Sequence, residues 1–324
     1  WRRVVARLVH EDADVLDGLP GLSRAAREHL RAAARTDRLQ VVDRRLSPRD
    51  GFAKYLFRGG DGAVFEAVRI PLERPRWSVC VSSQAGCALA CAFCETGRLG
   101  LTRNLQAWEI VEQVLTVRRE SPQRPVTGVV FQGQGEPLQN YEQVLAAAAL
   151  LRDPCGLRIR GDRITISTVG LLPAIERYTE EGHPYRLILS LTSAFDDVRQ
   201  GLVPLAGTYS VAQLAAAMRR HAQRRGGPVH LGWVLMSGLN TRPEEARELA
   251  RLFAGVPVRI SVIDVNTAGD ARFRRAGDDE RARFLTALAQ NGLPFVRRYS
   301  GGPDIDAACG LLAAQARGGT AIVP

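Results

Sequence analysis

Three cysteines gathered in one short stretch constrain this chain more than any other feature of its sequence. Cys87, Cys91 and Cys94 follow the spacing C-x3-C-x2-C within residues 86–94. This spacing puts three thiolates on a single loop, close enough together to ligate one metal centre. A structural zinc site normally has four ligands, and the sequence contains no second C-x2-C or H-x3-H pair that would complete one.

A centre with three cysteine ligands leaves one metal position open. Ferredoxin-type motifs supply four cysteines to each cluster, whereas a [4Fe-4S] cluster held by Cys87, Cys91 and Cys94 keeps one iron free. The stretch resembles the loop of radical SAM enzymes, whose open iron chelates S-adenosylmethionine (SAM) before one electron cleaves the C5′–S bond. Phe93 is also typical of those loops. A zinc ion with a remote fourth ligand and three unconnected buried thiols are the alternatives.

Length and charge narrow the class of protein. At 324 residues and 45% hydrophobic, the chain can bury one large core and a small accessory domain. We expect no membrane association, because no long apolar run and no signal peptide are visible, and cysteine spacing that suits a metal favours the cytoplasm. The net charge is +10, and nearly all of the positive charge is arginine, since Lys54 is the only lysine. A GC-rich genome would explain the arginine bias, but the charge still favours a polyanion such as nucleic acid.

The apolar pattern divides the chain into three expected domains. Residues 1–37 show helical spacing and predict a small N-terminal helical accessory domain. Residues 38–76 alternate with a period of two around a probable turn at 59–62, which predicts a short β-rich linker layer. Residues 77–324 form the third part, in which strand and helix patterns alternate.

This third part predicts an α/β fold. Strands that alternate with helices form a parallel sheet with the helices outside, and about six such units suit a partial (β/α)6 TIM-type barrel of the radical SAM kind. The chemistry of such a barrel lies at the C-terminal ends of its strands. Strands are predicted over 78–82, 128–132, 163–167, 185–191, 230–236, 258–266 and 295–298, and helices over 105–119, 141–152, 172–180, 211–224, 243–253 and 279–291, with a last helix after Cys309.

Several of these strand ends carry residues that suit a SAM site. Gly135 lets the backbone approach a ligand, and the Glu136 carboxylate can accept from the ammonium group of SAM. Short polar groups at other strand ends suit its ribose and carboxylate. An ordinary turn at Glu136 and helix N-capping at the other positions are the competing interpretations. The further candidates are Ser167, Thr168, Ser190, Leu191, Thr192 and Asn266.

Two further thiols lie outside the C-x3-C-x2-C motif. Cys309 follows the last predicted strand in a glycine-flanked loop, and Cys80 precedes the first motif cysteine on a predicted strand. Two thiols near one active site suggest covalent chemistry followed by resolution of the adduct. A lone cysteine is more often an inert buried thiol, which is our interpretation of Cys155.

Taken together, these stretches resemble the radical SAM adenosine methyltransferases of RNA, the RlmN/Cfr family. The resemblance runs nearly end to end, and the Asp-Ile-Asp-Ala-Ala-Cys-Gly stretch at 304–310 is its most specific part. The other matching stretches are 80–94, Arg103-Asn104-Leu105, 133–137, Ile166-Ser167-Thr168 and Leu202-Val203-Pro204-Leu205.

The resemblance implies a mechanism. A first SAM would methylate Cys309, and a second SAM, cleaved at the cluster, would give a radical that takes a hydrogen from that methyl. The resulting methylene radical would add to C2 or C8 of an adenine in ribosomal or transfer RNA. Glu66 would serve as the base, and Cys80 would release the product through a transient disulfide with Cys309. The implied cluster ligands are Cys87, Cys91 and Cys94, and the implied SAM contacts are Gly135, Glu136, Ser167, Ser190, Leu191, Thr192 and Asn266.

The chain departs from the family pattern at three positions. Gln134 stands where Met is usual, Thr192 stands where His is usual, and Asn266 is followed by Thr-Ala rather than Pro. A radical SAM methyltransferase acting on a small molecule or peptide is therefore an alternative, and an RNA-binding protein with a redox-sensing cluster is a third. For the main hypothesis we expect a monomer that receives its electron from a donor such as flavodoxin or ferredoxin.

Overall fold

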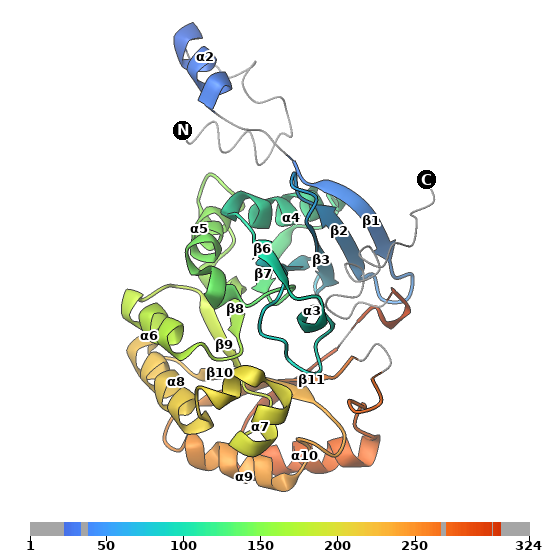
Figure 1. Cartoon of the computed structure of the whole chain (residues 1–324), viewed down its shortest axis with the longest axis vertical. Coiled ribbons are helices and arrows are strands. Elements are labelled where there is room, and N and C mark those ends of the chain that lie inside the picture. Colours follow the sequence, from blue (N-terminus) through green and yellow to red (C-terminus); the bar gives the residue numbers. More distant parts are fainter. Residues whose placement is uncertain (1–22, 34–37, 267–269, 300, 306–324) are drawn as a thin grey trace.

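A single curved sheet organises the protein. The computed structural model describes residues 23–33, 38–266, 270–299 and 301–305. In this part of the chain ten strands form one sheet in the order β1-β2-β3-β4-β7-β8-β9-β10-β11-β12, which Figure 1 shows from one side. The strands are β1 (Gln40–Leu46), β2 (Ala53–Arg58), β3 (Val64–Pro71), β4 (Trp77–Val81), β7 (Val126–Phe131), β8 (Ile164–Thr168), β9 (Arg186–Ser190), β10 (Val229–Leu235), β11 (Val258–Asp264) and β12 (Phe295–Arg298).

The two halves of this sheet differ in strand direction. Strands β1 to β4 pair antiparallel, whereas each neighbouring pair from β4 through β12 is parallel. Helices connect the parallel strands, as expected for parallel neighbours, which need a crossover between them. The parallel half with its helices is the predicted partial TIM-type barrel, and the fold prediction is confirmed.

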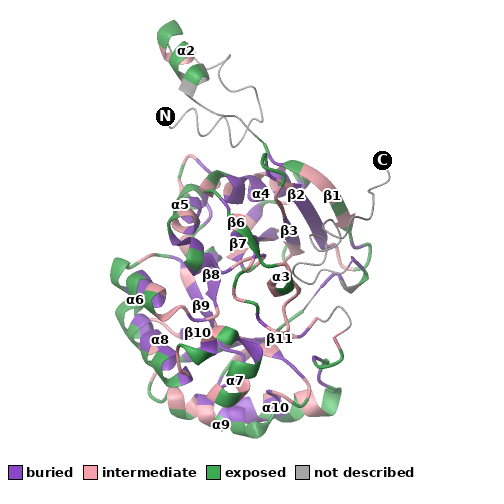
Figure 2. Ribbon diagram, viewed as in Figure 1, coloured by how far each residue is buried: buried purple, intermediate pink, exposed green. Residues whose placement is uncertain are grey.

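Apolar side chains hold the helices on the outer face of the sheet. Leu189 of β9 and Trp233 of β10 belong to one buried cluster that also includes Val114 and Phe284 from the helices. Figure 2 shows the strands as mostly buried and the outer sides of the helices as exposed. The helices are α2 (Arg24–Ala33), α3 (Glu95–Arg98), α4 (Ala107–Glu120), α5 (Tyr141–Arg152), α6 (Leu172–Glu181), α7 (Asp196–Leu202), α8 (Val211–Arg225), α9 (Pro243–Leu252) and α10 (Asp278–Gln290).

The opposite face of the sheet, which we call the interior face, carries small and polar residues. Ser190 Oγ lies 3.3 Å from where a side chain at Gly232 would begin, and Ser78 Oγ lies 3.1 Å from the same position at Gly128. Successive residues of a strand alternate between faces, so Ser190 and Gly232 point away from the apolar cluster formed by their neighbours. The glycines therefore allow serine side chains of the neighbouring strands to pack closely on the interior face.

Most predicted elements are present, with shifts of one or two residues at their ends. Prediction from sequence missed a two-stranded sheet formed by β5 (Gln84–Gly86) and β6 (Leu101–Asn104), and it missed the short helices α3 and α7. Helix α2 lies within the predicted N-terminal helical region, of which the structure describes residues 23–33, and the helix predicted after Cys309 lies outside the described residues. The division at residues 37 and 76 stays a prediction.

None of the helices in the described ranges combines the length and the apolarity that crossing a bilayer requires.

Candidate active site

The three motif cysteines lie on one loop between β5 and α3. Cys87 N donates to Gly100 O over 3.0 Å, and Cys94 N donates to Cys91 O over the same distance. Ala92 N donates to Leu202 O over 2.9 Å, which ties the middle of the loop to the end of α7. Cys91 also packs in an apolar cluster with Leu202. The loop is therefore fixed at its start, middle and end by backbone hydrogen bonds.

Glycine is required where this loop begins. Gly86 has φ +78°, and a side chain there would begin 1.9 Å from Gly100 O. Ala90 has φ +50°, a conformation that costs free energy for a residue with a side chain. The tight turn brings the cysteines near one another: Cys94 raises the pKa of both Cys87 and Cys91, and Cys87 raises that of Cys91.

Burial keeps the first two thiols protonated in the absence of a metal. It raises the pKa of Cys87 to about 11 and the pKa of Cys91 to about 12, with a further increase from the neighbouring cysteine sulfurs. Iron binding has to displace these protons, and the positive charge of the metal favours the thiolates. A buried, protonated thiol set of this kind suits a metal centre better than it suits an exposed nucleophile.

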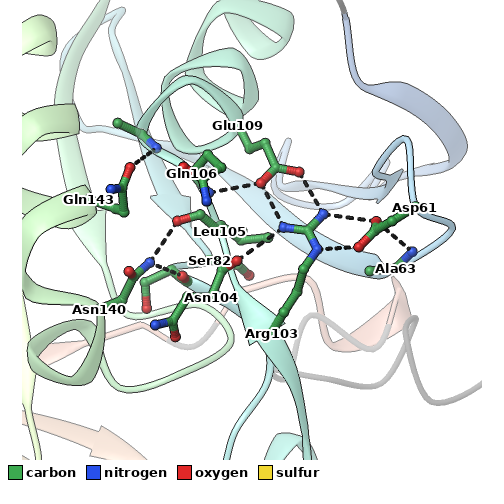
Figure 3. Close-up of polar contacts among 12 residues, drawn as sticks. Asp61, Ala63, Ser82, Arg103, Asn104, Leu105, Gln106, Glu109, Asn140 and Gln143 are labelled. Atoms are coloured by element: carbon green, nitrogen blue, oxygen red, sulfur yellow. Dashed lines mark hydrogen bonds and ion pairs between the residues drawn. The ribbon is translucent and has the colours of Figure 1, made fainter.

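Strands β5 and β6 form a hairpin whose connection carries the three motif cysteines, and we call residues 84–104 the cysteine hairpin. An arginine on β6 anchors this hairpin to two other elements. Arg103 Nη1 lies 2.7 Å from Glu109 Oε2 at the start of α4, and its Nη2 donates to Asp61 Oδ1 over 2.9 Å in the turn between β2 and β3. Figure 3 shows the Arg103 guanidinium between these two carboxylates. Glu109 also accepts from Gln106 N over 2.8 Å. The contacts of Arg103 with Glu109 and Asp61 therefore connect the cysteine hairpin with α4 and with the antiparallel half of the sheet.

The turn after β7 holds Gly135 and Glu136 close to the cysteine hairpin. Gly135 has φ +94°, and a side chain there would begin 2.5 Å from Gln84 Cβ of β5. Glu136 is 3% exposed, and its carboxylate accepts from Leu138 N over 3.0 Å and from Val169 N over 2.9 Å. Burial raises the pKa of Glu136 to about 7, although these hydrogen bonds favour the ionised form.

The predicted polar strand ends of β8 and β9 meet. Ser167 Oγ and Ser190 Oγ lie 3.0 Å apart, and Thr168 Oγ1 accepts from Gly170 N over 3.1 Å. Thr192 has φ +70°, which is strained for a β-branched residue, and its carbonyl accepts from Asn240 Nδ2 over 2.7 Å. The loop after β9 therefore holds a strained residue at the position where the chain departs from the family pattern.

Two buried charged residues that hold this loop were not predicted. Glu245 of α9 is 0% exposed and accepts from Ser193 Oγ over 2.9 Å and from Ala194 N over 2.7 Å. Arg199 of α7 is 1% exposed, and its Nε donates to Leu191 O over 3.0 Å. Both act on backbone groups distant from their own elements, so no sequence signal separates Arg199 from the many other arginines.

Asn266 lies in a separate contact. Its Oδ1 accepts from Arg275 Nη2, and Arg275 Nε also donates to Val265 O over 3.1 Å. Asn266 follows β11 by two residues and so lies on the same edge of the sheet as the ends of β8 and β9.

The interior face of the antiparallel half carries Glu66 and Cys80. The strand register places Lys54 of β2 opposite Val68 of β3, and Val68 opposite Cys80 of β4. Glu66, two residues before Val68, shares their face, and its Oε2 lies 3.4 Å from Lys54 Nζ. The exposed fractions of these two side chains are 0% for Lys54 and 2% for Glu66. An ion pair is therefore buried beside the thiol.

Cys80 lies near the Glu66 carboxylate and beside an apolar cluster. Burial raises the pKa of Cys80 to about 12, and the Glu66 carboxylate raises it further, against a hydrogen bond from the Gln132 backbone. Cys80 packs against a small apolar cluster formed by Phe52, Val68 and Ile305. The thiol is half-buried. Like the other described cysteines, Cys80 is not in a disulfide.

Cys309 lies outside the described residues, but the segment that leads toward it is described. Gly302 N donates to Asp50 Oδ2 over 2.7 Å, and Asp304 Oδ1 accepts from Ser47 Oγ over 2.9 Å. Ile305 reaches the apolar cluster beside Cys80. The chain thus comes to the interior face of β3 and β4 four residues before Cys309.

The donor set fits an iron–sulfur cluster. Three thiols on one fixed loop leave one iron without a protein ligand, as cofactor binding to that iron requires. No three His, Cys, Asp or Glu side chains in the described ranges converge tightly enough to hold one metal ion. That finding concerns a single ion, whereas each thiolate of a [4Fe-4S] cluster ligates a different iron.

Comparisons with known proteins agree with this site. The family model of the Radical SAM superfamily matches residues 81–253. A probable RNA methyltransferase of Anaeromyxobacter is 48% identical, over 98% of this chain and 93% of its own length. A probable dual-specificity RNA methyltransferase RlmN of Symbiobacterium thermophilum is 40% identical, over 95% of this chain and 82% of its own length. The crystal structure of a radical SAM methyltransferase from Sphaerobacter thermophilus matches with a TM-score of 0.88 and 37% identity, covering 95% of this chain and 91% of that one.

The chain is therefore a member of the radical SAM superfamily, whose cofactors are a [4Fe-4S] cluster and SAM. Within that superfamily it belongs to the RlmN family of RNA methyltransferases.

Proposed function

We propose that this radical SAM RNA methyltransferase transfers a methyl-derived carbon, by way of Cys309, to C2 or C8 of an adenine in ribosomal or transfer RNA. The matches to RNA methyltransferases along nearly the whole chain support RNA as the substrate. The alternative of a small molecule or peptide substrate is not favoured by these relatives. A cluster that only senses redox state is not favoured either, because the relatives are named as enzymes.

The cofactors have proposed positions along one edge of the sheet. Cys87, Cys91 and Cys94 would hold the cluster, which together with bound SAM supplies the radical chemistry. Glu136 would accept from the SAM ammonium group, and its carboxylate is held ready by two backbone N–H groups. The remaining proposed contacts with SAM are Gly135, Ser167, Ser190, Leu191, Thr192 and Asn266.

The observation that carries the proposal is the grouping of Glu66, Cys80 and Ile305. Glu66 and Cys80 share the interior face of two neighbouring strands, and Ile305 packs beside Cys80 four residues before Cys309. Cys309 would carry the methyl group, and Glu66 would take the proton from the adenine carbon while the radical adduct gives one electron back through the cluster. Cys80 would then lose its own proton and attack the Cys309 sulfur as a thiolate. That attack would form a Cys80–Cys309 disulfide and break the bond between Cys309 and the product carbon, which would take up a proton to become the methyl group. An external thiol reductant would then restore the two cysteines.

Lys54 supports the proposed role of Glu66. A base must be ionised before it accepts a proton, and a buried carboxylate loses that form unless a cation compensates it. Lys54 Nζ at 3.4 Å supplies that positive charge where water does not reach. The only lysine in the chain thus contacts the residue that we propose as the base.

The partners and the compartment follow from the same chemistry. The cluster needs an electron, for which we propose a flavodoxin or ferredoxin as donor. We further propose a monomer that works in the reducing cytoplasm without a membrane. The free state of all five cysteines within the described ranges agrees with a reducing compartment.

Replacement of the two outlying thiols tests the proposal. Cys309→Ala has no sulfur to hold the carbon, so neither methylated RNA nor a covalent adduct should form. Cys80→Ala can still attack the base but cannot release the product, so protein should accumulate covalently joined to RNA. The adduct should appear as a nuclease-sensitive shift on a denaturing gel.

Cys155→Ala is the matched control, because Cys155 lies in the loop after α5 and should behave like the wild type. Free methylated RNA formed by Cys80→Ala at the wild-type rate would show that the role assigned to Cys80 is wrong.

A further inference from the structure

Arg199 lies where the cysteine loop meets the ends of β8 and β9. It is 1% exposed on the short helix α7. Its Nε donates to Leu191 O over 3.0 Å, and its Nη2 donates to Val169 O. Leu191 follows β9 and Val169 follows β8, so two of the three guanidinium nitrogens cross-link the two strand ends that carry proposed SAM contacts.

The third nitrogen of this guanidinium is buried without a hydrogen-bond partner. Nη1 is the only guanidinium nitrogen of Arg199 that no group in the described residues accepts from. Leaving a buried donor of a charged group unpaired costs on the order of 1–3 kcal/mol or more, so such donors in folded proteins usually have a function or a missing partner.

The positive charge of Arg199 is also uncompensated by an ion pair. Among the ion pairs that the described ranges contain, Arg199 takes part in none. A guanidinium stays charged at neutral pH even when it is buried. A buried cation in this state calls for a nearby anion.

The nearest candidate for that anion is at the cysteine loop. Arg199 and Leu202 are three residues apart on α7 and therefore share one face of that helix. The loop and α7 are also in direct contact, since Ala92 N donates to Leu202 O over 2.9 Å and Cys91 shares an apolar cluster with Leu202. A [4Fe-4S] cluster with three thiolate ligands carries net negative charge, and reduction makes that charge larger.

We propose that Arg199 is the counter-ion of the cluster: Nη1 donates to the Cys91 thiolate or a cluster sulfide and stabilises the reduced, more negative state. Hydrogen bonds to the sulfurs and net charge are among the factors that set the potential of such clusters. Arg199 is a positioning residue in this role, because its other two nitrogens fix the strand ends beside the cluster. The inference rests on the cluster of the proposed function but not on the route of the methyl group.

The test compares Arg199→Gln with Arg199→Lys in anaerobically reconstituted protein without RNA. Gln removes the charge and keeps one donor for a backbone carbonyl, whereas Lys keeps the charge. The measurements are iron content and the midpoint potential of the cluster, followed by electron paramagnetic resonance during reductive titration. We expect Arg199→Gln to bind iron and to have a midpoint potential more negative than the wild type, and Arg199→Lys to stay near the wild type.

Arg220→Gln is the matched control, since Arg220 is exposed on α8 and pairs with Glu176. Its midpoint potential should equal that of the wild type. An unchanged midpoint in Arg199→Gln at full iron content overturns the proposal. If Arg199→Gln does not fold, a clearly more negative midpoint in Arg199→Lys overturns it instead, because that variant retains the charge.

The outcome separates this inference from the proposed function. A wild-type protein that binds no iron would contradict the cluster itself, whereas failure of Cys80→Ala to trap RNA would contradict only the methyl route. A midpoint unaffected by Arg199 would leave both of those results intact.

Discussion

The two halves of the sheet place their functional groups differently. In the parallel half, Glu136, Thr168 and Thr192 lie at or just after the C-terminal ends of strands. Backbone N–H groups donate to the Glu136 and Thr168 side chains, and the Asn240 side chain donates to the Thr192 carbonyl. In the antiparallel half, Glu66 and Cys80 lie within β3 and β4. Their setting is a buried ion pair and an apolar cluster rather than a loop.

The two halves of the sheet therefore hold their functional side chains in two physically different ways. Parallel strands deliver their ends to a common edge, so loops there can bind a cofactor with backbone dipoles and short polar side chains. Antiparallel strands bring side chains into rows across the sheet, so a charge within a strand needs a partner from the neighbouring strand. We expect substitutions in the antiparallel half to cost more stability, because each buried charge there depends on the opposite charge of its partner, whereas Glu245 in the parallel half binds a hydroxyl and a backbone N–H group.

Lys54→Met should have the largest effect on stability. It leaves the Glu66 carboxylate buried without its cation, and breaking a buried pair by removing one partner costs about 3–5 kcal/mol. The midpoint of urea unfolding measures the loss. The double variant Lys54→Met/Glu66→Leu should recover most of it, because an apolar pair of similar volume is tolerated. A loss below about 1 kcal/mol in the single variant would contradict the strategy that we assign to this half.

Arg103→Met should have the next largest effect, because Arg103 links the cysteine hairpin to both α4 and the antiparallel half. Glu109 is nearly buried and would keep only its hydrogen bond from Gln106 N. We expect a loss of about 2–3 kcal/mol, smaller than at Lys54 because Arg103 is partly exposed. Denaturant unfolding measures it, and Arg103→Met/Glu109→Gln should restore part of it. No recovery in the double variant would show that packing rather than charge explains the loss.

Glu245→Gln in the parallel half should cost only about 1 kcal/mol at neutral pH, because Gln can accept from Ala194 N and donate to Ser193 Oγ. Burial raises the pKa of Glu245, so the folded protein binds this proton more tightly than the unfolded chain. The contribution of this group to stability therefore falls as the pH rises from its ordinary value through the raised one. Thermal unfolding across the acid range should show that the variant lacks this decline. A parallel pH profile for the two proteins would contradict the assignment.

Asp61→Asn should have the smallest effect, about 0.2–1 kcal/mol, because Asp61 is about half exposed in the turn between β2 and β3. The hydrogen bond from Arg103 lowers the pKa of Asp61 to about 2. Its contribution is present above the ordinary pKa of a carboxylate and is lost as the pH falls toward 2. The stabilities of the variant and the wild type should converge there, opposite in sign to the behaviour at Glu245. Glu244→Gln, in a surface pair on α9, is the control.

The sequence predicted the parallel half of the site better than the antiparallel half. A strand followed by Gly-Gln-Gly-Glu or Ser-Leu-Thr reveals its position along the barrel, since strand ends share one edge. Glu66 came only from the resemblance, because its alignment with Cys80 depends on the register between β3 and β4. The contacts of Arg199 and Glu245 were missed because a side chain that bonds to distant carbonyls or N–H groups leaves no local pattern. Cys309 lies outside the described residues, so its role stays a prediction.

The burial of the only lysine also has a consequence for handling the protein. Amine-reactive labels and crosslinkers find no lysine on the native surface, because Lys54, on β2, is 0% exposed. Modification of this side chain requires the antiparallel strands to open, and its rate therefore reports how often they do. Mass spectrometry of a protein treated with such a reagent would follow the opening of a single sheet edge without an introduced probe.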